Sequence, residues 1–106
     1  MKAMLELNLQ ETNQIFLGER VTITLKEHGS VGIKSKAITN DESIISYVTS
    51  NFEYSNATIP MQPGGDGGHR TYVFKANKSG NTTITTQRIF RGRLEHEHNI
   101  DIIVTA

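Results

Sequence analysis

The sequence predicts an all-β protein, a sandwich of about seven short strands, and three observations carry that prediction. Apolar residues alternate with polar ones over most of the chain, which is the period of half-buried strands. Threonine, whose β-branched side chain favours strands, occurs twelve times. Turn residues separate the apolar runs, and no segment is long enough for the crossover helices of βαβ units.

Four segments in the first half of the chain are expected to be extended. Apolar residues alternate with polar ones over 5–9 and again over 21–25. Two further extended segments are expected at 44–48 and 52–54. Between them and the earlier strands lies the polar segment 34–43, which holds too few apolar residues for a core helix and to which we assign no strand.

The second half is expected to contain a hairpin and a final strand. The segment 71–75 precedes the turn signal Asn-Lys-Ser-Gly-Asn at 77–81, and the β-branched run 82–86 follows directly. These two runs are therefore expected to pair with each other. The last strand, 100–104, carries its apolar side on the even-numbered residues.

Length and composition limit the possible functions. The chain of 106 residues fits one core, so we expect residues 1–106 to form a single domain. It has no cysteine, which excludes disulfides, a thiol nucleophile and cysteine-ligated zinc. The 11 basic and 11 acidic residues give a net charge of zero, with no block of like charge that would attract nucleic acid or a membrane. The sequence also lacks a metalloprotease helix motif and a nucleophile elbow, so it is not expected to be an enzyme.

No apolar stretch has the length of a signal peptide core or of a membrane helix, for which about 20 residues are needed. We therefore expect a soluble chain that has no signal peptide within these residues. The sequence does not decide between the cytoplasm and a lysosome-like vesicle.

Three loop signatures stand out in this β sequence. They are His28-Gly29-Ser30-Val31-Gly32-Ile33, then Gly64-Gly65-Asp66-Gly67-Gly68, and finally Arg88-Ile89-Phe90-Arg91. The second has four glycines in five residues, and glycine allows close backbone approach and positive φ at little steric cost. The third is expected to be a basic and aromatic turn. Together the three signatures predict one binding edge without catalytic chemistry.

The order and spacing of these segments resemble the chagasin family of cysteine-protease inhibitors, which are immunoglobulin-like β-sandwiches. The usual first loop of that family is Asn-Pro-Thr-Thr-Gly before an aromatic residue, and this chain matches it closely only at Gly32. The second family loop, Gly-x-Gly-Gly, is matched fully by Gly65-Asp66-Gly67-Gly68. The third, Arg-Pro-aromatic, keeps its arginine and aromatic residue in Arg88-Ile89-Phe90 but loses the proline.

The resemblance covers Gly18 to Val104 and implies an immunoglobulin-like β-sandwich of about seven to eight strands. It implies reversible, non-covalent inhibition of papain-like, cathepsin L-type cysteine proteases by a monomer without a cofactor. The departures in the loops are those of a divergent member, similar to the amoebic inhibitors called amoebiasins. The implied protease-binding residues are His28, Gly29, Ser30, Val31, Gly32, Gly65, Asp66, Gly67, Gly68, Arg88, Ile89 and Phe90.

In the mechanism that the resemblance implies, the first loop lies over the catalytic cysteine of the protease. Gly29 and Gly32 would let its backbone come close, while Ser30 and Val31 stand where the family has two threonines. The glycine-rich loop would lie along one side of the cleft. Phe90 would pack on the other side as an aromatic anchor.

Other interpretations of these residues stay open at this point. The same fold could serve as a non-inhibitory protein-binding or carrier module that uses the same loops. The glycine cluster could be a simple hairpin tip, and Phe90 an ordinary core residue. On a strand, His96 and His98 would share a face and could bind a divalent metal with His69 or a carboxylate, although His-x-His alone is a weak signal and no metal site is assigned.

Overall fold

The structure is a computed structural model, and it describes residues 5–54 and 67–106. This part of the chain contains eight strands and no α-helix. The strands are β1 (Leu5–Glu6), β2 (Asn13–Phe16), β3 (Arg20–His28), β4 (Ile33–Thr39), β5 (Ile45–Tyr54), β6 (Gly67–Ala76), β7 (Gly80–Phe90) and β8 (Arg93–Thr105). A single turn of 3-10 helix, η1 (Gly29–Val31), connects β3 to β4.

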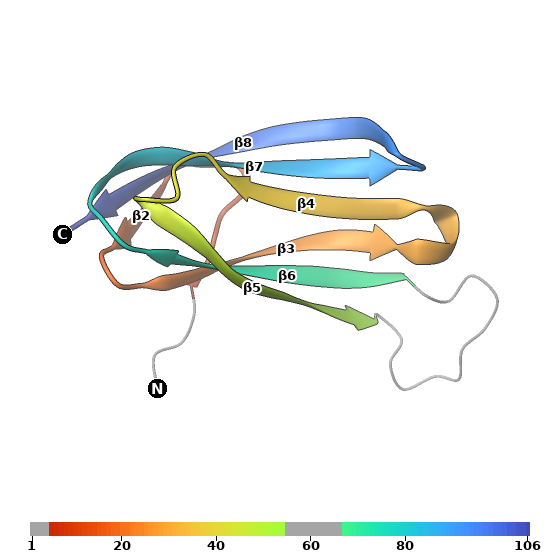
Figure 1. Ribbon diagram of the computed structural model, residues 1–106, viewed down its shortest axis with the longest axis horizontal. Helices are drawn as coiled ribbons and strands as arrows, with labels where there is room; N and C mark the ends of the chain where they lie inside the picture. Colours follow the sequence, from red (N-terminus) through yellow and green to blue (C-terminus); the bar gives the residue numbers. More distant parts are fainter. Residues whose placement is uncertain (1–4, 55–66) are drawn as a thin grey trace.

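The strands follow one hydrogen-bonded path, β2-β8-β7-β4-β3-β6-β5, and β1 pairs in parallel with β3. Figure 1 shows β4, β7 and β8 beside one another, next to β3, β6 and β5. Strands β3 and β4 share only one paired position, His28 with Ile33. Because the ladder stops there, the path divides into two layers that are joined at one corner. The all-β, immunoglobulin-like sandwich predicted from the sequence is therefore confirmed.

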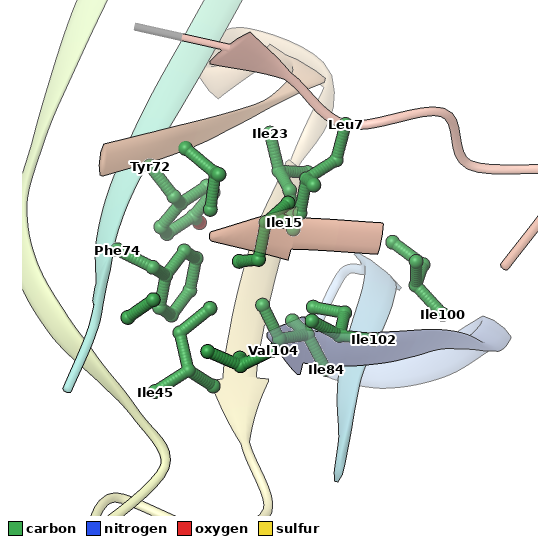
Figure 2. Close-up of a cluster of buried hydrophobic side chains, with 12 residues drawn as sticks. Leu7, Ile15, Ile23, Ile45, Tyr72, Phe74, Ile84, Ile100, Ile102 and Val104 are labelled. Carbon is green, nitrogen blue, oxygen red and sulfur yellow. The ribbon is translucent and has the colours of Figure 1, made fainter. Parts of the chain in front are cut away.

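The apolar core lies between the two layers, away from the β3–β4 connection. Figure 2 shows its side chains converging around Ile15 of β2 from strands of both layers. Its largest fully buried side chains are Phe74, Ile15, Ile23, Ile45, Ile84, Ile100, Ile102 and Val21. Each such side chain contributes about 1.5–3 kcal/mol by leaving water. Most of the packing energy therefore belongs to the half of the molecule opposite the β3–β4 connection.

The remaining half is thin and extended. In β8, for example, Ile100, Ile102 and Val104 are buried, whereas every residue from Arg93 to Glu97 is exposed. The radius of gyration is 15.0 Å, compared with about 13 Å for a compact chain of 100 residues. The alternation predicted for 100–104 is confirmed, but it applies only to the part of β8 that lies over the core.

The predicted hairpin between 71–75 and 82–86 is wrong. Strand β6 pairs with β3 and β5, whereas β7 pairs with β4 and β8, so the two strands belong to different layers. The intervening turn carries the chain across the sandwich. Its first residue, Asn77, is fixed to the β5 layer because its N–H donates to the Ile44 carbonyl at 2.8 Å and its side chain to Ser46 Oγ at 2.7 Å.

The segment 34–43, to which no strand was assigned, contains most of β4. The inward positions of β4, which are Ile33, Ser35 and Ala37, are half-buried, and the lysines between them are exposed. The alternation is weak in the sequence because two of the inward residues are small or polar. Similarly, the predicted segments 44–48 and 52–54 belong, apart from Ile44, to one strand, β5, with a register shift between Tyr47 and Thr49.

Candidate functional site

The described residues of the three loop signatures lie at the same end of the molecule, opposite the core. His28 is paired with Ile33 and with Gly67, and Ile33 is in turn paired with Phe90. The β3–β4 and β7–β8 connections and the adjoining ends of β5 and β6 therefore form one edge, at the right of Figure 1. Of the residues implied in protease binding, Gly65 and Asp66 lie outside the described residues.

The first loop is a compact turn. After η1, Gly32 adopts a left-handed conformation with φ of +79°, and its N–H donates to the Gly29 carbonyl at 3.1 Å. This conformation favours glycine, because a Cβ would be strained there. Val31, directly before it, has 39% of its surface exposed and stands at the tip of the molecule. The loop thus presents an apolar side chain on a backbone that is internally bonded.

The third signature differs from the expected basic and aromatic turn. Arg88, Ile89 and Phe90 are the last residues of β7, and the turn itself consists of Arg91 and Gly92. These two residues have φ of +49° and +82°, the signs of a type I′ hairpin turn. The Arg91 guanidinium carbon lies 5.1 Å from the centre of the half-buried Phe90 ring. The turn therefore carries a cation over an aromatic side chain.

Arg88 points away from this arrangement toward the next strand. Its Nε forms an ion pair with Glu95 Oε1 at 2.8 Å, and both side chains are 48% exposed. A pair so exposed contributes little to stability because water screens it. Arg88 is therefore held by β8, and Arg91 is the cation that accompanies Phe90.

The first and third loops are joined directly. The Arg91 N–H donates to the Gly32 carbonyl at 2.9 Å. A Cβ built on Gly32 would lie 3.0 Å from the Arg91 Cγ atom and 3.5 Å from the Arg91 backbone nitrogen, so the two loops are in close contact. The first and third loops therefore form one connected unit across β4 and β7.

Gly67 and Gly68 of the second signature are strand residues at the start of β6. A Cβ on Gly67 would lie 2.7 Å from Cδ2 of the His28 ring, which packs over this glycine. A Cβ on Gly68 would lie 2.1 Å from the Glu53 carbonyl oxygen. Both glycines are thus required for close packing within the sheet, a requirement that the loop pattern did not indicate.

A polar cluster lies directly beneath the first loop, and the sequence analysis did not predict it. Glu27 Oε2 accepts hydrogen bonds from the backbone N–H of Ser35 at 3.1 Å, from its hydroxyl at 2.7 Å and from Arg70 Nε at 3.1 Å. Tyr72 Oη donates to the Ser35 carbonyl at 2.9 Å. The only sequence signal is that Glu27 continues the inward-facing series Ile23 and Leu25, which places a charge on an apolar face.

The surroundings of this cluster determine its charge. Burial alone would raise the pKa of the Glu27 carboxyl, but the hydrogen bonds from Ser35 and Arg70 outweigh that effect and hold the pKa below its ordinary value. Burial raises the pKa of the Tyr72 hydroxyl. The cluster therefore contains a carboxylate, a guanidinium and a neutral phenol at physiological pH.

An open hollow adjoins the cluster on the β5 side, with a volume of about 440 Å³. It is lined by Glu27, Gly29, Ile33, Lys34, Ser35, Phe52, Tyr54 and Arg70. The Phe52 and Tyr54 rings meet edge to face with their centres 5.0 Å apart, and the Arg70 guanidinium carbon lies 5.7 Å from the Phe52 ring centre. The edge that carries the loops is therefore hollowed and partly aromatic.

The alternative metal site is not assembled in the part of the chain that the structure describes. His96 and His98 lie in β8, whereas His69 lies in β6 of the other layer. His98 Nε2 is 2.5 Å from the Leu9 carbonyl oxygen, which fixes that ring to the N-terminal segment. Within residues 5–54 and 67–106, no three histidine, aspartate or glutamate side chains converge in a way that could hold a metal ion.

Most of the sequence matches a known family. The model of the family described as chagasin family peptidase inhibitor I42 aligns with residues 14–104. The chain belongs to the chagasin family of peptidase inhibitors. The resemblance carried by the three loop signatures is thereby confirmed, as is the expectation of an inhibitor rather than an enzyme.

Solved structures agree with the fold of a chagasin-family domain. EhICP2, a cysteine protease inhibitor from Entamoeba histolytica, superposes with a TM-score of 0.72 at 15% identity and 96% coverage of both chains. The solution structure of amebosin gives 0.63 at 17% identity, covering 98% of this chain and 100% of that one. PbICP-C, solved in complex with falcipain-2, gives 0.54 at 16% identity and 98% coverage of both. No curated protein matches the chain significantly.

Membership of the chagasin family does not identify which side chains touch a protease. The contact residues implied by the resemblance stay predictions, among them those described at the loop end. Within the described residues, no helix is long and apolar enough to span a membrane.

Proposed function

We propose that this chagasin-family chain inhibits papain-like cysteine proteases reversibly by laying its three-loop end over the active-site cleft. The observation that carries the proposal is the gathering of the described loop residues at one edge, where the Arg91 N–H binds the Gly32 carbonyl. PbICP-C, which has the same fold, was solved with falcipain-2, and this supports a protease as the partner.

In this proposal the first loop enters the cleft and acts without covalent chemistry. Val31 provides an exposed apolar tip, and Gly29 has no Cβ to prevent close approach of the backbone. The loop is already ordered by the Gly32 to Gly29 bond and by the bond from Arg91. A preformed loop loses little conformational entropy on binding, so a modest interface can be tight.

The other two loops would contact the walls of the cleft. Phe90 and the Arg91 guanidinium above it supply an aromatic and cationic surface on one side, a combination that is frequent among binding hot spots. On the other side, Gly65 and Asp66 are proposed from the sequence pattern alone.

The non-inhibitory module considered above has no observation that favours it over this function. The compartment, cytoplasm or lysosome-like vesicle, stays a prediction.

The proposal is tested by titrating papain and a cathepsin L-type enzyme with the purified protein while hydrolysis of a fluorogenic peptide is followed. We expect stoichiometric loss of activity that is regained on dilution with competing substrate. Activity that persists in both enzymes at micromolar protein would overturn the proposal. Cleavage of the chain during the assay would contradict a non-covalent blocking mechanism, and mass spectrometry of the mixture detects it.

A further inference from the structure

The two layers separate just below the first loop, and side chains continue the connection there in place of the backbone. Beyond the single pair of His28 with Ile33, no residues of β3 and β4 are in register. Two positions further along β4, the Ser35 N–H donates to the Glu27 carboxylate and the Ser35 carbonyl accepts from Tyr72 Oη. Both backbone groups that would have paired with a neighbouring strand are thus bound by side chains.

These bonds connect the strands on either side of the first loop to the strand that follows the second. Glu27 belongs to β3, Ser35 to β4, and Arg70 and Tyr72 to β6. The Ser35 hydroxyl bonds to Glu27 Oε2 at 2.7 Å and lies 2.8 Å from Tyr72 Oη, so it occupies the centre of the cluster. A change in the angle between the layers would have to break several of these bonds together.

The cluster lies between the apolar core and the first loop. Tyr72, which is 7% exposed, belongs to both the core and the cluster, whereas Glu27 and Ser35 are polar and only partly buried. The Glu27 side chain is only 12% exposed, so its hydrogen bonds are better protected from water than those of a surface pair. At this end of the molecule, directional polar contacts therefore add to apolar packing in joining the two layers.

We propose that Glu27, Ser35 and Tyr72 are positioning residues for inhibition, which hold the first loop at a fixed angle to the β6 strand. This inference rests on the proposed function, since it assigns to these residues the orientation of the loop that would enter the cleft. They act through Gly29, Val31 and Gly32 and need not touch the protease. Loss of their bonds leaves the loop sequence intact but its orientation variable, which weakens binding by removing preorganisation.

The test compares Tyr72→Phe and Glu27→Gln with a control substitution in the core, Ile102→Val. Tyr72→Phe removes one hydroxyl and leaves the buried ring in place, so the fold is retained. Ile102 is 1% exposed in the opposite half, and its shortening lowers thermal stability without touching the cluster. Two quantities are measured for each variant: the inhibition constant for papain, and the ¹⁵N relaxation order parameters of the Gly29 and Gly32 amides.

We expect each cluster variant to raise the inhibition constant by roughly fivefold to tenfold, the size of one lost hydrogen bond, and to lower both order parameters. Ile102→Val should leave both quantities unchanged. Equal inhibition constants for the cluster variants and the control would overturn the positioning role. If the wild type fails to inhibit papain, the proposed function fails, while the order parameters still decide whether the cluster fixes the loop.

Discussion

The Arg91 N–H and the Gly32 carbonyl are joined by a hydrogen bond of 2.9 Å that links the β7–β8 turn to the first loop. Both residues have positive φ, so each stands where the chain reverses sharply. The bond extends the β4–β7 pairing past the last ladder position, Ile33 with Phe90. The two loops are therefore expected to meet a protease as one body, and their substitutions should not act independently.

Gly32→Ala should weaken inhibition as well as stability. The left-handed φ of +79° costs an alanine about 1–2 kcal/mol, and the new Cβ would lie 3.0 Å from Arg91 Cγ. Gly18→Ala is the matched control, because its φ is +88° but nothing lies within 4 Å. Both variants should lose similar stability in thermal unfolding, and only Gly32→Ala should raise the inhibition constant. An equal inhibition constant in the two variants would show that the contact with Arg91 is irrelevant.

Gly68→Ala should destabilise the protein more than an alanine placed at a left-handed glycine would, because it disrupts the pairing of β5 with β6. Its Cβ would lie 2.1 Å from the Glu53 carbonyl oxygen, and a clash with backbone is relieved only by moving a strand. We expect a loss of more than about 2 kcal/mol in urea unfolding, as for other overpacked sites. Gly92→Ala serves as the comparison, because it has φ of +82° and open space around it. Its loss should stay near the 1–2 kcal/mol of left-handed strain alone. A Gly68→Ala protein as stable as the wild type would refute this packing role.

Strands β3 and β8 over the core could be predicted from the sequence, whereas β2, which carries the fully buried Ile15, could not. Strand β4 and the strand neighbours could not be predicted either. Residues 21–25 and 100–104 alternate clearly because one face of each is covered by the opposite layer. Strand β4 faces a polar cluster, so Ser35 stands where an apolar residue would have revealed the strand. A turn signal such as 77–81 indicates that the chain reverses, but it does not specify whether the next strand pairs with the previous one or crosses to the other layer.

The sequence predicted one binding edge from the three signatures taken together, and their described residues share one end of the molecule. The bonds between these residues could not be predicted. The contacts of Glu27 with Arg70 and of Arg91 with Gly32 join residues far apart in sequence, and polar residues have no periodicity that marks such partners. The roles of Gly67 and Gly68 were obscured for another reason. A glycine pattern identifies a close approach without specifying whether the approaching group is a partner protein or, as here, His28 and Glu53.

The stability contributed by Glu27 should disappear in acid. The pKa of its carboxyl lies below the ordinary value of 4.5 in the folded state, so the carboxylate stabilises the fold above the unfolded pKa. That contribution is lost as the pH falls through the lowered pKa. The melting temperatures of the wild type and Glu27→Gln should therefore differ at pH 7 and pH 5, and the difference should shrink as the pH falls below 4.5. A difference that is the same at pH 3 as at pH 7 would contradict the charged state assigned to this group.

Val31→Glu should abolish most of the inhibition without affecting the fold. Val31 is 39% exposed at the tip of the first loop, and a charge there would have to lose its water inside the cleft of a protease. Val48→Glu is a closely matched control, because Val48 is 38% exposed and lies at the irregularity of β5, away from the loop end. We expect the inhibition constant for papain to rise at least a hundredfold for Val31→Glu, mostly through faster dissociation, and to change less than twofold for Val48→Glu. If both substitutions have the same small effect, the first loop lies outside the interface, because a buried carboxylate cannot be tolerated there without a partner.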